Sequence, residues 1–271
     1  MAAELIDARG TVHRPAGGEA RIVSLVPSLT ELLFDLGLGD RVVGRTHFCI
    51  HPAEGVAGAA SVGGTKKISF RKLAALEPTH VILNVDENTE AMAAEVAAIA
   101  PNVIVTHPIE PRDNLALYRL FGGIFGRADR AELLCGRFAA ALASLREAAA
   151  GWPKRRVLYL IWKDPWMTVS RETYVSRLLA LAGWETVGHD PAVRYPEIAI
   201  DAALLAATDL VLFSSEPYPF KGADIDAFRA AYPAGRARLR LIDGEMTSWY
   251  GSRAIAGLDY LKRTAMSLPD G

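Results

Sequence analysis

The sequence predicts an α/β protein with two Rossmann-like lobes, joined by a single long helix and holding a ligand cleft between them. Apolar, β-branched runs alternate with helical patterns along all 271 residues, which favours mostly parallel sheets covered by helices. That alternation restarts after one uninterrupted helical stretch, and RIVSL at residue 21 and RRVLYL at residue 155 open the two halves alike. We therefore expect an N-terminal arm and lobe over residues 1–127, a connecting helix over 128–152 and a C-terminal lobe over 153–271.

The first half begins with an extended or hairpin arm over residues 1–20, because glycine and proline interrupt it. A short apolar strand over 21–26 ends at Pro27. Ser28 and Glu31 then have the spacing of a capping box, so we expect a helix to begin there. The further strands that we expect in this half lie at 41–45, 80–84 and 102–106, and the further helices lie near 69–77, 88–99 and 112–125.

The second half repeats this pattern after Gly151 and Pro153 end the long helix. The strands expected there lie at 155–162, 209–214 and 238–243, and the helices lie near 173–182, 200–207, 224–231 and 250–265. KLAALEPTHVILNVDE (72–87) matches ALLAATDLVLFSSE (203–216) when His80 is aligned with Asp209. This match indicates a duplicated design.

Composition excludes several classes of partner and setting. A net charge of −1 gives no electrostatic reason to expect nucleic acid or an anionic membrane, and no apolar run is long enough to insert into a bilayer. The two cysteines do not indicate a disulfide framework. The first residues lack the pattern of an export signal, so we expect a cytoplasmic monomer from the sequence as it stands, or a periplasmic one if a signal has been removed.

Enzyme signatures do not account for the sequence. GAASVGGTKK (58–67) resembles a phosphate-binding loop, but Gly64 stands where the loop needs lysine. Gly37, Gly39 and Gly44 follow a helix, whereas a dinucleotide fingerprint follows a strand. No G-x-S-x-G, H-E-x-x-H or C-x-x-C motif occurs. We therefore expect a binding protein and no catalytic residues.

The segment THFCIHP holds the clearest candidate metal ligands. Alternate residues of an extended segment point to the same side, and the imidazoles of His47 and His51 with the thiolate of Cys49 suit a zinc-like ion. Three ligands within five residues strain tetrahedral geometry, and a fourth ligand such as His107 would have to come from elsewhere. The alternative is a loop that reaches into the cleft without binding a metal.

Aromatic residues gather where the strands of the second half end, which is where α/β proteins bind ligands. They lie beside Pro, Ser, Gly and charged residues, so we favour a cleft lining over core positions. The candidate ligand-binding residues are Phe48, Lys66, Trp162, Trp166, Tyr195, Tyr218, Phe220, Trp249, Tyr250 and Arg253. Arg253 could instead pair with Glu245 or Asp243.

Two glutamates follow matching strands in the two halves, Glu87 in the first and Glu216 in the second. Each carboxylate could simply stabilise the N-terminus of the following helix, and that explanation fits Glu87 or Glu90 taken alone. As a matched pair, the two glutamates could instead contact two basic sites on a partner protein.

Several of these segments together resemble a known family. DARGTVHRP, RIVSLVPSLTELLFDLGLGDRVVG, VGG, LEPTHVIL and DGEMTSWYGSR are similar to segments of the helical-backbone, class III substrate-binding proteins of ABC importers, which include receptors for vitamin B12, haem and ferric siderophores. The resemblance covers nearly the whole chain and implies two lobes with one rigid connecting helix and a shallow cleft for a bulky metal chelate. It also implies docking on an ABC permease through a glutamate on each lobe, for which Glu87 or Glu90 and Glu216 are the nearest matches.

Two hypotheses follow. The first is an importer's binding protein for a corrinoid, a haem or a ferric siderophore, with aromatic faces on the ligand and Arg or Lys on its acidic groups. The second is a cytoplasmic carrier, sensor or enzyme on the same scaffold that handles a metal or metal complex through His47, Cys49 and His51. No cofactor is expected other than the chelate that is bound as ligand.

Overall fold

The protein forms two compact α/β units in a computed structural model that describes residues 4–187, 192–233 and 235–268. Unit 1 contains the chain up to Pro108, then Arg112–Phe138 and Tyr250–Arg253. Unit 2 contains Ile109–Pro111, Ala139–Trp249 and the chain from Ala254 onward. The two-lobed α/β fold class is confirmed. The short Tyr250–Arg253 segment of unit 1 comes from the far end of the chain, which no sequence pattern indicated.

Unit 1 is built on five parallel strands in the order β3-β2-β1-β4-β5. The strands are β1 (Ile22–Ser24), β2 (Val42–Thr46), β3 (Ala60–Gly63), β4 (His80–Asn84) and β5 (Asn102–Thr106). The helices are α1 (Pro27–Asp35), the 3-10 turn η1 (Gly39–Arg41), α2 (Ala53–Val56), α3 (Phe70–Ala75), α4 (Glu90–Ala97), α5 (Asp113–Ile124) and the first half of α6 (Ala128–Ala149). The strands predicted at 80–84 and 102–106 are confirmed to the residue.

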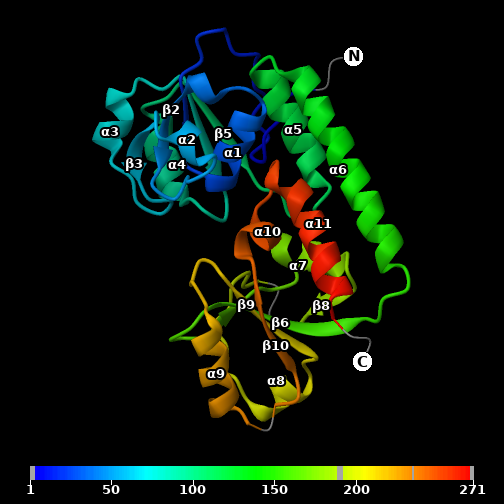
Figure 1. Cartoon of the computed structure of the whole chain (residues 1–271). Coiled ribbons are helices and arrows are strands. Elements are labelled where there is room, and N and C mark those ends of the chain that lie inside the picture. The colour runs from blue at the N-terminus through cyan, green and yellow to red at the C-terminus, as the bar shows by residue number, and fades with distance from the viewer. Residues whose placement is uncertain (1–3, 188–191, 234, 269–271) are drawn as a thin grey trace. The chain divides into compact units, whose positions relative to one another are not determined.

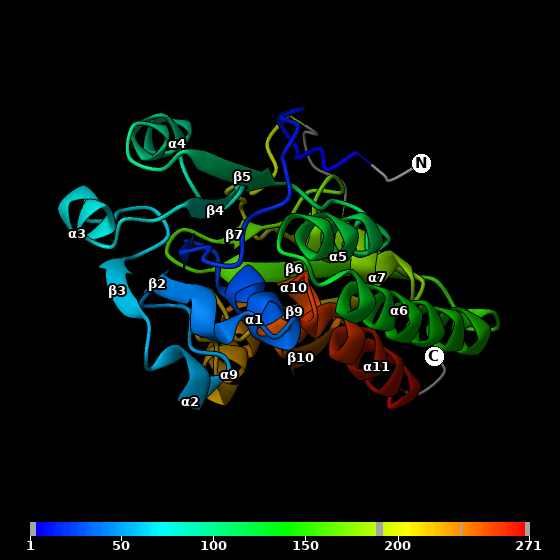
Figure 2. The ribbon, with the colours of Figure 1, turned by 90° about the horizontal axis from the view of Figure 1, so that it is seen from above.

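Helices cover both faces of this sheet. Figure 2 shows α3 and α4 on one face and α1 and α5 on the other. Between the sheet and the first pair lies an aliphatic core that includes Val23, Leu73, Val81 and Val96. All five strands are parallel, so their carboxyl ends meet at one edge of the sheet, which we call the carboxyl edge of unit 1.

The predicted N-terminal arm is a short hairpin held against β5; its first three residues lie outside the described part of the chain. Ile6 bridges Val12 in antiparallel fashion, and the amide of Ala8 donates to the carbonyl of Val105 at 2.9 Å. The turn is closed by Asp7, whose carboxylate also accepts a hydrogen bond from the buried His13 ring at 3.1 Å.

The capping box predicted at Ser28 is wrong. Helix α1 already begins at Pro27, with Val26 as its N-cap and no side chain capping it. Proline is favoured at the first helical position because its missing N–H has no partner there in any case. Thr30 donates its hydroxyl to the carbonyl of Val26 at 2.9 Å, and Glu31 pairs with Arg253. The sequence pattern was right about the helix and wrong about how it starts.

Unit 2 repeats most of this architecture. Its strands are β6 (Arg155–Trp162), β7 (Met167–Thr168), β8 (Trp184–Thr186), β9 (Leu210–Ser214) and β10 (Arg238–Ile242). Its helices are the second half of α6, α7 (Tyr174–Ala180), α8 (Ala202–Ala206), α9 (Gly222–Ala231), α10 (Gly244–Ser248) and α11 (Arg253–Met266), whose first residue belongs to unit 1. Only β7 runs antiparallel in this sheet. Figure 1 shows α8 and α9 on one side of it and α7 and α11 on the other.

The two sheets share one topology, which confirms the predicted duplication. Strand β6 pairs in parallel with β8 and β9, and β9 pairs with β10, just as β1 pairs with β2 and β4, and β4 with β5. The aligned residues also make the same backbone bond, since His80 donates to the carbonyl of Arg21 and Asp209 to that of Arg156. Unit 2 has no counterpart of β3 among its described residues.

The elements that the sequence analysis missed are short: α2, β3, β7, β8 and α10 each have five residues or fewer. Within the part of the chain that the structure describes, no helix is both long and apolar enough to cross a membrane.

Candidate functional site at the carboxyl edges of the two sheets

The carboxyl edge of unit 1 exposes apolar side chains. Phe48, Ile50 and Val85, in the loops after β2 and β4, are each about half exposed, at 53%, 50% and 49%. The ring of His47 lies on that of Phe48, with centroids 4.1 Å apart. Gly64, in the loop after β3, approaches both rings so closely that a Cβ there would lie 3.2 Å from His47. Large exposed apolar groups at such an edge suit contact with a ligand.

Polar contacts tie the loops of this edge together. The Lys66 ammonium donates to the carbonyl of Asp86 at 2.6 Å, so its charge lies between the loops after β3 and β4. The Asp86 carboxylate lies 3.7 Å from Nε2 of His107 in the loop after β5. Asn88 is buried and donates to the carbonyl of Thr65 at 2.8 Å. The loops after β3, β4 and β5 are therefore connected, although β3 lies at the opposite edge of the sheet from β5.

The proposed soft-metal segment does not form a ligand cluster. Cys49 is fully buried; its sulfur accepts a hydrogen bond from the Thr30 hydroxyl and contacts that of Thr46, both at 3.1 Å. Burial raises the pKa of the Cys49 thiol, which disfavours the thiolate that a metal needs. Among residues 4–187, 192–233 and 235–268, no three His, Cys, Asp or Glu side chains are grouped so as to hold a metal ion. The metal role of His47, Cys49 and His51 stays a prediction with no structural support.

The carboxyl edge of unit 2 carries aromatic rings and a lysine. Trp162, at the end of β6, is 41% exposed and packs edge-on against Tyr218, with ring centroids 5.5 Å apart. The Lys163 ammonium lies 5.2 Å from the centre of the Tyr218 ring and pairs with Asp224, which raises the pKa of Lys163. Tyr195 is exposed as well. We call Trp162, Lys163, Tyr195 and Tyr218 the aromatic rim of unit 2.

Trp166 and Phe220 lie differently from what the sequence suggested. Phe220 is only 4% exposed and belongs to the core of unit 2 together with Phe213 and Phe228. The half-buried Trp166 stacks on Phe220, with the ring planes 9° apart, and contacts Phe228 edge-on. Their neighbouring prolines and charged residues suggested an accessible loop, but α9 covers both rings.

Three further candidates, Trp249, Tyr250 and Arg253, are committed to internal partners. The indole of Trp249 donates to Glu216 and the hydroxyl of Tyr250 donates to Glu87, both at 2.7 Å. The guanidinium of Arg253 makes a two-pronged ion pair with Glu31, and both of its bonds are 2.7 Å long. The structure thus gives Arg253 the partner Glu31, and the suggested pairing with Glu245 or Asp243 stays a prediction.

The candidate docking glutamates differ in whether they are held by internal partners or exposed. Burial raises the pKa of the Glu216 carboxyl above its ordinary value. Burial and the nearby Glu87 carboxylate also hold the pKa of the Tyr250 hydroxyl well above its ordinary value. Glu90, by contrast, is exposed at the first position of α4, where Thr89 caps the helix. Of the three glutamates, Glu90 alone presents an exposed side chain.

Sequence reasoning missed the residues that hold Tyr250–Arg253 in unit 1. Asn114 accepts the amide of Gly251 at 2.6 Å, and Tyr118 donates to the Gly251 carbonyl at 2.8 Å. Both lie on α5, where Tyr118 fits an ordinary apolar helix face. Asn114 was the signal that could have revealed this attachment, because a buried amide side chain must find hydrogen-bond partners.

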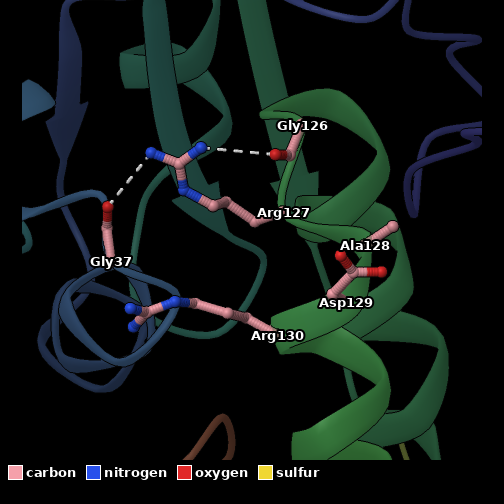
Figure 3. Close-up of a pocket in the computed structure, with 6 residues that line it drawn as sticks. All are labelled: Gly37, Gly126, Arg127, Ala128, Asp129 and Arg130. Carbon is pink, nitrogen blue, oxygen red and sulfur yellow. Dashed lines mark hydrogen bonds between the residues drawn. The ribbon is translucent and has the colours of Figure 1, made fainter.

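A hollow of about 680 Å³ lies elsewhere on unit 1, beside the N-terminus of α6 (Figure 3). Arg127 donates to the carbonyls of Gly37 and Gly126, and Arg130 donates to that of Asp35, each at 3.3–3.4 Å. These bonds fasten the turn after α1 to the start of α6. Because Asp35 and Gly37 end a helix that runs back from the carboxyl end of β1, this hollow lies away from the carboxyl edge.

Comparisons with known proteins agree with this architecture. The periplasmic binding protein family matches residues 22–232. The vitamin B12-binding protein of Yersinia pestis (strain Pestoides F) is 23% identical over 206 residues, which span 74% of this chain and 71% of that protein.

Solved structures show the same fold. The periplasmic vitamin B12 binding protein BtuF of Vibrio cholerae superposes with a TM-score of 0.79 at 18% identity, over 93% of this chain and 99% of that one. The periplasmic heme-binding protein RhuT from Roseiflexus sp. RS-1 has a TM-score of 0.74 at 25% identity, over 92% and 98%. The resemblance found in the sequence is thereby confirmed, and the chain belongs to the periplasmic binding protein family, in the two-lobed class III group that includes vitamin B12- and haem-binding proteins.

Proposed function

We propose that this protein is the substrate-binding component of an ABC importer and that it binds a metal chelate, namely a corrinoid, a haem or a ferric siderophore. The family match supports the role as a binding protein, and similar proteins are named as vitamin B12-binding or heme-binding proteins. The observation that carries the ligand class is the exposed aromatic rim of unit 2, with Trp162 edge-on to Tyr218.

The carboxyl edges suit such a ligand chemically. A macrocyclic or catechol-rich chelate offers large planar faces, on which aromatic side chains pack favourably. Phe48 and Ile50 in unit 1 and Trp162 in unit 2 provide exposed apolar surface. Lys163, His47 and His107 are polar groups near these surfaces that can meet acidic groups of the chelate. No residue of the chain needs to supply a catalytic step for this function.

Tryptophan fluorescence tests the proposal directly. Cyanocobalamin, haemin and a set of ferric siderophores are titrated into micromolar protein, and one of them is expected to quench the emission with one ligand per chain. Trp162→Ala should weaken that binding about fivefold or more, since an aromatic contact contributes about 1 kcal/mol beyond its buried area. Trp152→Phe is the matched control, because Trp152 precedes β6 and lies at the opposite end of that strand from Trp162. Absence of quenching by the whole panel would refute the chelate as ligand.

We further propose Glu90 as the residue of unit 1 that contacts the permease, and the periplasm as the compartment. Its exposed position at the start of α4 supports the docking role over that of Glu87. Glu90→Lys is expected to abolish co-purification with the detergent-solubilised permease and ATPase of the source cell while ligand binding stays intact. Glu95→Lys, on the same helix, is the control. Cell fractionation with an antibody tests the compartment, and protein found only in the cytoplasm would contradict it.

A further inference from the structure

We infer that Asp224 determines the charge specificity of the aromatic rim of unit 2. By pairing with Lys163, it neutralises the one charged side chain of that rim, so that an uncharged planar part of a ligand binds there in preference to an acidic one. The inference concerns unit 2 alone. It rests on the proposal that the rim contacts the ligand, and it narrows the chemistry of that contact.

The Lys163 ammonium is held from two sides. It pairs with the Asp224 carboxylate and lies 5.2 Å from the centre of the Tyr218 ring. The Lys163 and Asp224 side chains are only 29% and 14% exposed, so water reaches the pair from one side and screens it incompletely. The ammonium therefore has a charged acceptor already in place before a ligand binds.

Asp224 is itself fixed at the start of α9. Its second carboxylate oxygen accepts a hydrogen bond from the amide of Lys221, the N-cap residue, at 2.8 Å. A negative charge in the first turn of a helix is also favoured by the helix dipole. The pairing with Lys163 and the bond from the Lys221 amide lower the pKa of the Asp224 carboxyl below its ordinary value. The carboxylate therefore stays ionised and in position at neutral pH.

The aromatic part of the rim is anchored independently of this ion pair. The Tyr218 ring packs on the buried Phe220, with ring centroids 4.6 Å apart, and the Tyr218 amide donates to the carbonyl of Ile161 at 3.2 Å. Trp162 leans edge-on against Tyr218 and remains 41% exposed. An uncharged planar group can gain contact with these rings without disturbing the pairing of Lys163 and Asp224.

An acidic group meets a different balance of charges. If it bonds to Lys163 on the side away from Asp224, the two negative groups lie about 5–7 Å apart, since each is one hydrogen bond from the same ammonium. Repulsion over that distance in a partly hydrated setting should weaken the contact about three- to tenfold. Lys163 can still meet an acidic group, but Asp224 removes much of the gain. We therefore expect the part of the chelate that lies on unit 2 to carry carboxamide, hydroxyl or hydrocarbon groups.

Two matched probes, naphthalene-2-carboxamide and naphthalene-2-carboxylate, test this preference. Each is titrated into the full chain at pH 7, and its dissociation constant is measured from the NMR shift of the Trp162 indole N–H, which Trp162→Phe assigns. The carboxamide is expected to bind the unchanged chain at least as tightly as the carboxylate. Asp224→Asn keeps an oxygen for the Lys221 amide and removes the charge. It should strengthen carboxylate binding about three- to tenfold and change carboxamide binding less than about twofold.

Lys163→Met should act in the opposite direction, because it leaves the Asp224 charge to repel the carboxylate, and it measures the same preference if Asp224→Asn fails to fold. The matched control is Asp226→Asn, on the same helix, whose 76% exposed side chain pairs with Arg229; it should leave the ratio of the two dissociation constants unchanged.

Three outcomes would overturn the inference: tighter binding of the carboxylate by the unchanged chain, an unaltered ratio in Asp224→Asn, or no shift of Trp162 with either probe. Failure of every chelate to quench fluorescence would refute the proposed function and leave the preference between the probes intact. The two proposals can therefore fail separately.

Discussion

The two units of this protein share a strand topology but differ in the side chains that pack against their sheets and in those at the carboxyl edges. In unit 1 the core between the sheet and helices α3 and α4 is aliphatic, whereas aromatic rings such as Phe121 and Phe138 are buried among α5 and α6; its carboxyl edge exposes Phe48, Ile50 and Val85 among histidines and a lysine. The core of unit 2 contains a cluster of aromatic rings that continues to the exposed rim at Trp162 and Tyr218. The same strand topology therefore accommodates different side chains in parts of its core and at its edges, as expected when hydrophobic pattern and volume specify a core.

The difference also explains why the aromatic residues of unit 2 were hard to sort by sequence. Rings at the ends of these strands form a continuous series, with Phe213 and Phe220 inside, Trp166 and Tyr218 between, and Trp162 outside. Substitutions that separate core from edge therefore sharpen the comparison.

The largest expected effect comes from Phe220→Ala. Removing this buried ring leaves a cavity beside Phe213 and Phe228 and should lower the free energy of unfolding by about 3–5 kcal/mol. Trp162→Ala, only a few residues from the same core but 41% exposed, should cost much less. Denaturant melts of both variants measure the contrast. Equal losses would mean that Trp162 is as much a core residue as Phe220.

The second prediction concerns pH and the first residue of β4. Burial, with a smaller contribution from His13, lowers the pKa of His80 to about 4, whereas its aligned residue in unit 2 is the partly exposed Asp209. In the unfolded chain His80 takes up a proton near pH 6.5. The stability that the neutral His80 ring contributes to the fold is therefore fully present above that pH and is lost as the pH falls toward 4. The loss should reach about 3 kcal/mol.

The contribution of the Asp7 carboxyl to folding stability is also lost as the pH falls, but at lower pH. Backbone amides and His13 outweigh its burial and lower the pKa of Asp7, so its contribution is lost below its ordinary value of 3.8. Unfolding free energies between pH 7 and pH 4 should therefore fall less steeply for His80→Gln than for the unchanged chain. Parallel curves for the two proteins would rule out His80 as the titrating group.

The third and smallest effect compares two ion pairs of unit 1 with the same two-pronged geometry. Arg253→Met leaves Glu31 half-buried without its partner and should cost about 2 kcal/mol. Arg119→Met breaks a similar pair with Glu132, whose bonds are 2.7 and 3.0 Å long, but both of those side chains are about half exposed to water, and little change is expected. Thermal melts of the two variants measure the difference. Equal shifts would mean that burial does not decide the strength of these pairs.

Local patterns predicted most of the framework. Strands over 80–84, 102–106 and 155–162 were found as expected, because each is a short apolar, β-branched run between helical segments. Elements of five residues or fewer, such as β3 and β8, were missed because so short a run carries little periodicity. The start of α1 was misplaced because proline at the first helical position outweighed a plausible capping box.

The candidate site was predicted less well, and for a physical reason. Its residue types and their place at strand ends were visible in the sequence, but exposure was not. Phe48 and Trp162 are exposed while Phe220 and Trp249 are buried, although all four lie among polar or turn-forming neighbours. Burial depends on which helix covers a loop, and that is a property of packing between segments distant in the chain.

The sequence by itself determined the two α/β units, their duplicated order and the family to which the chain belongs, because these rest on periodicity and on short motifs within single segments. Only the tertiary structure decided that Tyr250–Arg253 completes unit 1 and that Glu87 and Glu216 accept bonds from adjacent residues. Those bonds join residues 33 and 163 positions apart. A hydrogen bond over such a separation leaves no trace in local pattern, because it exists only once both sheets have folded.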